Sequence, residues 1–135
     1  MKLYVISGLG ADKTVFENIV FPEKFSEIIF IDWLIPETEE IFEHFVKRMA
    51  KPIDEKEKFC LLGYSFGGIM VQEINKLKPA EKIVILGSIK SQKEMSVTFH
   101  LAKKSKIFAK IPENYFGEKT LKSYAFFRKY FDPKN

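Results

Sequence analysis

Four short, almost continuously apolar runs constrain the fold of this chain more than any other feature. Their length and their β-branched content are typical of strands buried on both faces. The segments between them are polar or carry apolar residues at helical spacing. This alternation predicts an α/β fold with a doubly wound, mainly parallel sheet of about four strands and right-handed crossovers. The four runs are Leu3–Ser7, Glu27–Asp32, Phe59–Gly63 and Lys82–Gly87.

Helix signals occupy the intervals between these runs. Thr14 and Glu17 have capping-box spacing for a short first helix. Thr38 is placed to cap a second helix over 38–50, with acidic residues near its start and basic residues near its end, as the helix dipole favours. A third helix follows Ser65 and ends before Pro79. The apolar face of the second helix is predicted to comprise Ile41, Phe42, Phe45, Val46 and Met49.

The last third of the chain differs from the rest. From Lys90 onward, eleven Lys or Arg face four Asp or Glu, and no strong strand pattern occurs. We expect residues 1–89 to form the core and 90–135 a helical cap or lid within the same domain, with helices such as Val97–Ile107 and Leu121–Phe131. The basic surplus fits a solvated helical surface, and no nucleic-acid motif accompanies it, so no nucleic-acid partner is expected.

Composition excludes several classes of site. No apolar run reaches the length of a transmembrane segment, and the N-terminal run is too short for a signal peptide. The single cysteine, Cys60, is expected to be a buried core thiol, and it fits a cytoplasmic location. Two histidines and one cysteine provide no metal-ligand cluster, so neither a metal nor another cofactor is expected.

The motif Gly63-Tyr64-Ser65-Phe66-Gly67 joins the third apolar run to the helix that follows it. A GxSxG motif in this strand–turn–helix setting forms a nucleophile elbow, a strained turn that exposes the serine hydroxyl. Glycines are needed on both sides because larger side chains would collide with the adjacent backbone. Ser65 is therefore the candidate catalytic nucleophile.

Acyl transfer also needs hydrogen-bond donors for an oxyanion. The backbone N–H of Phe66, the residue after the nucleophile, is one candidate. The second candidate is the N–H of Leu9, in the Gly8-Leu9-Gly10 turn that follows the first predicted strand.

Together, this turn, the elbow and the fourth apolar run resemble the α/β-hydrolase superfamily in order and spacing, over residues 2–88. Ser7 stands where many members have histidine. The resemblance implies that the 28–32 strand lies at one edge of the sheet, followed by 3–7, 59–63 and 83–87. It also implies a serine hydrolase of the esterase type, which forms an acyl-enzyme at Ser65 from a small carboxylic ester, thioester or amide.

The chain departs from this family in its triad. The acid and the histidine follow the serine in that fold, on loops after later strands that are missing here. His44 precedes the serine, which leaves His100 as the base candidate, and Asp32 and Asp132 are poor fits for the acid. The pattern predicts a truncated chain whose 82–87 strand has an exposed edge, open to self-association.

Two other functions remain open. A non-catalytic, hydrolase-like protein would keep the pocket and bind a partner through the basic, aromatic cap. A nucleotide-binding module would use Gly8-Leu9-Gly10 with Asp32, although the third glycine of that fingerprint is absent. Trp33 and Tyr64 are placed near the expected pocket mouth, where they would either line a substrate site or pack into the core.

Overall fold

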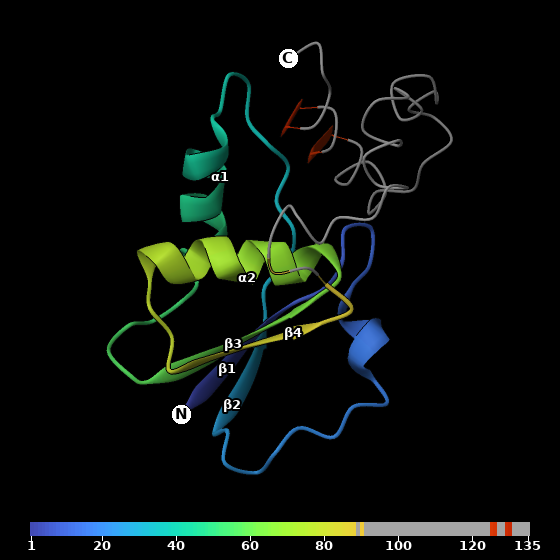
Figure 1. Ribbon diagram of the computed structural model, residues 1–135, viewed down its shortest axis with the longest axis vertical. Helices are drawn as coiled ribbons and strands as arrows, with labels where there is room; N and C mark the ends of the chain where they lie inside the picture. The colour runs from blue at the N-terminus through green and yellow to red at the C-terminus, as the bar shows by residue number, and fades with distance from the viewer. Residues whose placement is uncertain (89, 91–124, 127–128, 131–135) are drawn as a thin grey trace.

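A four-stranded, all-parallel sheet forms the centre of the protein (Figure 1). The computed structural model describes residues 1–88, 90, 125–126 and 129–130. The sheet order is β2-β1-β3-β4, which confirms the α/β class and matches the order that the resemblance implied. The strands are β1 (Lys2–Ile6), β2 (Glu27–Phe30), β3 (Phe59–Tyr64) and β4 (Lys82–Leu86).

Two helices cover one face of the sheet. Helix α2 (Phe66–Leu77) lies across the strands, and α1 (Phe42–Met49) packs against α2 (Figure 1). Buried side chains of alternating strand residues, such as Tyr4 and Leu61, meet Met70 and Ile74 of α2 in this core. This larger core fixes α2, and therefore the turn that enters it, against the centre of the sheet.

The opposite face is covered by the connection from β1 to β2. That connection begins with a 3₁₀ helix, η1 (Lys13–Phe16), and brings Phe16, Phe21 and Phe25 over Leu3, Val5 and Leu62 (Figure 1). The connection contributes phenylalanine rings to this smaller core, in addition to its one short helix. Helical elements thus lie on both faces, as expected for a doubly wound sheet.

Two predicted helix caps are wrong. The first helix is capped by Asp12, whose carboxylate accepts a 3.0 Å hydrogen bond from the Thr14 N–H, so Thr14 and Glu17 form no capping box. Helix α1 begins at Phe42 instead of after Thr38, and its N-cap Ile41 is 66% exposed. Ile41 therefore does not belong to the apolar face of α1, whose buried residues are Phe45, Val46 and Met49.

Only four residues beyond Lys90 are described, and they are helical. One of them, Phe126, is fully buried among aromatic rings of the larger core, with ring centroids 5.3 Å from Trp33 and 5.6 Å from Phe66. The predicted helix Val97–Ile107, and the rest of the predicted cap, lie outside the described residues. Within the described part of the chain, no helix is long and apolar enough to cross a membrane.

Candidate functional site

Ser65 occupies a strained turn between β3 and α2. Its backbone angles are φ 54° and ψ −122°, a region that residues with a Cβ rarely adopt. The Ser65 N–H donates to the Leu86 carbonyl at 2.8 Å, and the Ser65 carbonyl accepts from the Gly68 N–H at 3.0 Å. These bonds fix the turn to β4 and to the first turn of α2, while the Ser65 side chain stays exposed. This is the geometry expected of a nucleophile elbow.

The glycines around Ser65 are required by close backbone approaches. A Cβ atom on Gly63 would lie 2.2 Å from the Gly67 carbonyl oxygen. A Cβ atom on Gly67 would lie 2.3 Å from the Ile6 carbonyl oxygen and 2.5 Å from that of Ser7. Helix α2 therefore begins against the end of β1, and only glycine allows this packing.

The turn after β1 lies beside Ser65. A Cβ atom on Gly8 would be 3.3 Å from Ser65 Cβ and 3.7 Å from Ser65 Oγ. The turn is held by the Ser7 hydroxyl, which donates to the Ala11 carbonyl at 3.0 Å, and by the Ala11 N–H, which donates to the Gly8 carbonyl at 3.1 Å. The structure thus brings together Ser65 and the glycine turn that contains Leu9, two parts of the site predicted from distant segments of the sequence. Phe66, the other predicted donor, is the first residue of α2.

No acid or histidine hydrogen-bonds to Ser65 within the described residues. The base candidate His100 and the acid candidate Asp132 lie outside those residues. His44 lies on α1 and pairs with Glu40, while Asp32 is exposed beyond the end of β2. Within the described residues, Ser65 therefore stands in the predicted position of a nucleophile, without the base that would activate one.

Trp33 and Tyr64 have different environments. Trp33 is 5% exposed and donates its indole N–H to the Ser7 carbonyl at 2.9 Å, so it belongs to the core and not to an open pocket mouth. Tyr64 is 40% exposed, with its ring edge-on to Phe16 at 6.3 Å. Neither contact was predicted, because each joins residues far apart in the sequence.

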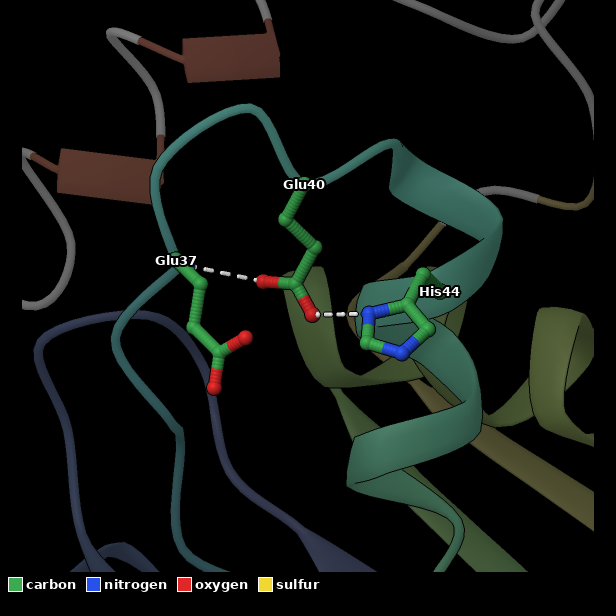
Figure 2. A group of neighbouring side chains, drawn as sticks. All are labelled: Glu37, Glu40 and His44. Carbon is green, nitrogen blue, oxygen red and sulfur yellow. Dashed lines mark hydrogen bonds and ion pairs between the residues drawn. The ribbon is translucent and has the colours of Figure 1, made fainter.

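A second group of polar side chains lies at the start of α1 (Figure 2). Glu40 has a side chain only 1% exposed, and it accepts hydrogen bonds from the Glu37 N–H at 2.8 Å and from Arg48 at 2.9 Å. His44 Nδ1 lies 2.8 Å from the other Glu40 oxygen. This group was not predicted from the sequence. The regular spacing of residues 40, 44 and 48 is a signal that could have indicated it, but this spacing gives no indication that Glu40 is buried.

This group is an ion-pair network and not a metal centre. The ligand atoms of Glu37, Glu40 and His44 lie within 4.8 Å of one another. However, the Arg48 guanidinium already contacts both Glu40 oxygens and lies 3.4 Å from a Glu37 oxygen, so a cation would have to displace it. Burial raises the pKa of Glu40, but the hydrogen bonds from Glu37, His44 and Arg48 outweigh burial and hold that pKa below its usual value.

Tyr130 lies next to this network. Burial, together with the nearby charge of Glu40, raises the pKa of the Tyr130 hydroxyl to about 12. The Tyr130 ring packs on Phe42 and Phe45 of α1, at centroid distances of 5.3 Å and 5.7 Å. These ring contacts attach Tyr130 to α1.

Comparison of the sequence with protein-family models and with curated proteins finds no match.

Proposed function

We propose that the protein is a serine hydrolase of the α/β-hydrolase type, which acts on a small carboxylic ester, thioester or amide through an acyl-enzyme at Ser65. One observation carries the proposal: an exposed serine at φ 54° between a central parallel strand and the helix that follows it. Strain of this kind costs about 1 to 3 kcal/mol, and it is found mainly where function requires it.

The proposed reaction assigns each group a role. Ser65 Oγ attacks the substrate carbonyl, its proton passes to a base, and a tetrahedral oxyanion forms. The Leu9 and Phe66 N–H groups are the expected donors to that oxyanion. The C–O, C–S or C–N bond then breaks, the leaving group takes the proton, and water hydrolyses the acyl-enzyme. His100 is the candidate base.

Two features of the described residues support these roles. Gly8 packs against Ser65, so the turn that contains Leu9 borders the hydroxyl. Ser65 is also the N-cap residue of α2 and makes no side-chain capping bond. Its hydroxyl is therefore not engaged in capping, and the positive end of the helix dipole favours negative charge beside it.

Covalent labelling with a fluorophosphonate tests the proposal. With His100 as the base, we expect the full chain to gain one probe mass, measured on the intact protein, and Ser65→Ala to gain none. Ser88→Ala is the matched control, since this serine also lies near the start of α2 and should leave labelling unchanged. A chain that is folded by circular dichroism but does not label would contradict the proposal and favour the non-catalytic binding function.

A further inference from the structure

We infer that Trp33 is a positioning residue for the oxyanion site, holding the peptide that lies over Ser65. This inference rests on the proposed function and adds a residue that neither touches the substrate nor belongs to the elbow. Trp33 follows β2, the neighbour of β1 in the parallel sheet. Because the carboxyl ends of parallel strands meet at one edge, the indole reaches the turn after β1.

Trp33 is hydrogen-bonded to the turn that follows β1. The Trp33 indole N–H donates to the Ser7 carbonyl at 2.9 Å, in a buried setting where an unpaired donor or acceptor is costly. The Ser7–Gly8 peptide is planar and trans, so fixing its carbonyl toward Trp33 turns the Gly8 N–H to the opposite side. The Gly8 N–H is thereby oriented, and the following peptide, which carries the Leu9 N–H, is held by the 3.1 Å bond from the Ala11 N–H to the Gly8 carbonyl.

The same carbonyl is also packed against α2. A Cβ atom on Gly67 would lie 2.5 Å from the Ser7 carbonyl oxygen, so that oxygen touches the first turn of α2. The Ser7 carbonyl is therefore held between the indole and the helix that presents Ser65. Loss of the indole N–H would leave this oxygen buried without the donor, and the peptide would have to rotate to satisfy it.

Trp33 also packs against Phe66, the other expected donor. The Trp33 ring lies 6.4 Å from the Phe66 ring, centroid to centroid, and both rings pack on the buried Phe126. One side chain thus contacts both the turn that carries Leu9 and the residue that follows the nucleophile. Such a residue fixes the distance between two oxyanion donors without contacting the substrate.

Replacing the indole N–H tests the inference. We expect Trp33→Phe to lower the maximal rate of fluorophosphonate labelling of Ser65 by about 10- to 100-fold, because the phosphoryl oxygen needs both donors in the transition state. The half-saturating probe concentration should change by less than about twofold, since ground-state binding does not depend on them. The ¹⁵N amide signals of Gly8 and Leu9 should shift in the same variant.

Two further proteins separate positioning from stability. Trp33 is the only tryptophan in the chain, so global replacement by benzothienylalanine removes the N–H and keeps the shape of the ring. It should slow labelling as Trp33→Phe does. Phe45→Leu is the matched control, because Phe45 is fully buried and packs on Phe126 as Trp33 does. It should lower stability and leave the maximal labelling rate unchanged.

The outcomes are distinguishable. If the wild-type chain labels at Ser65 and both Trp33 replacements label as fast as the wild type, the inference is wrong and the proposed function stands. Slow labelling in Phe45→Leu as well would also overturn it, since general loosening of the core would then explain the effect. If the wild-type chain does not label, the proposed function fails first and the inference fails with it.

Discussion

At the scale of single residues, the backbone strain at Ser65 persists because its surroundings leave no alternative. Gly63 and Gly67 let β3, α2 and the end of β1 approach to distances that no side chain would permit. The Ser65 N–H is bonded to Leu86 of β4, so the turn is also tied to the neighbouring strand. The energy stored in the turn is thus offset by packing between elements that are rigid for other reasons.

The tight approach at Gly67 predicts a large loss of stability on substitution. In Gly67→Ala the new methyl group would meet the Ile6 carbonyl at 2.3 Å, and neither backbone has room to move. We expect the free energy of unfolding to fall by about 3 kcal/mol, as for other overpacked buried sites. Urea denaturation followed by circular dichroism measures this change.

Gly8→Ala is the control for this substitution. Its nearest neighbour would be the Ser65 Cβ at 3.3 Å, a contact that small shifts relieve. The expected loss of stability is less than about 1 kcal/mol. Equal losses in the two variants would show that the close approach at Gly67 does not hold the elbow together.

Sequence alone predicted the residues whose role is local. Gly63, Ser65 and Gly67 belong to one short motif. The apolar strand and the amphipathic helix that make this motif informative flank it directly in the sequence. The role of Trp33 depends on a carbonyl 26 positions earlier in the chain. No pattern of apolar spacing carries that information, because the contact exists only after β1 and β2 have paired.

At the scale of elements, the start of α1 is set by a buried charge. Glu40 accepts from the Glu37 N–H, His44 and Arg48, which folds the segment before α1 back against the helix. These bonds fix the segment before α1, and α1 begins at Phe42 without a side-chain cap. The buried carboxylate of Glu40 therefore anchors the segment in which Thr38 was predicted to cap the helix.

Glu40 also predicts how stability depends on pH. Since the folded pKa of Glu40 is lowered, its contribution is fully present above the unfolded value near 4.5 and is lost as the pH falls through the folded pKa. The melting temperature of the wild-type protein should thus fall more steeply below about pH 4.5 than that of Glu40→Gln. Thermal unfolding between pH 3 and pH 7 measures both curves.

At neutral pH the wild-type protein should be the more stable of the two. Glu40→Gln leaves Arg48 facing a neutral amide, and we expect it to be less stable by about 1 to 3 kcal/mol. Glu43→Gln, whose exposed carboxylate pairs only with Lys47 in the described structure, is the control and should change little. Parallel pH curves for wild type and Glu40→Gln would contradict the role given to the network.

The regular elements were predictable to different degrees. The strands were located within one or two residues, since continuous apolar runs are long-range signals that each strand carries in itself. Helix starts were not, because they depend on the hydrogen bonds of Asp12 and on the ion pairs of Glu40, which the spacing of apolar residues does not reveal. Ile41 continues the apolar spacing of α1 but lies before its first turn, which is why it is exposed.

At the scale of the whole molecule, the two edges of the sheet differ. β2 is partly buried beneath the connection that precedes it, through Phe21 and Phe25. β4 pairs only with β3 among the described residues, and its side chains Ile83, Val84 and Leu86 are 37%, 43% and 37% exposed. An edge strand with apolar, exposed side chains and one charge, Lys82, lacks the features that usually prevent pairing between molecules.

This edge predicts concentration-dependent self-association, which a charge on β4 should weaken. In Val84→Lys the ammonium group would lie on the exposed side of β4, where pairing with a second copy would bury it or place it near the same lysine of that copy. Sedimentation velocity over a range of concentrations should show a dissociation constant raised by about tenfold or more.

Val20→Lys is the matched control, since Val20 is 93% exposed and adjoins Phe21, on the side of β2. It adds the same charge away from β4 and should leave association unchanged. A wild-type chain that stays monomeric at every concentration, or equal effects of the two lysines, would contradict association through β4 and would assign any residual effect to net charge.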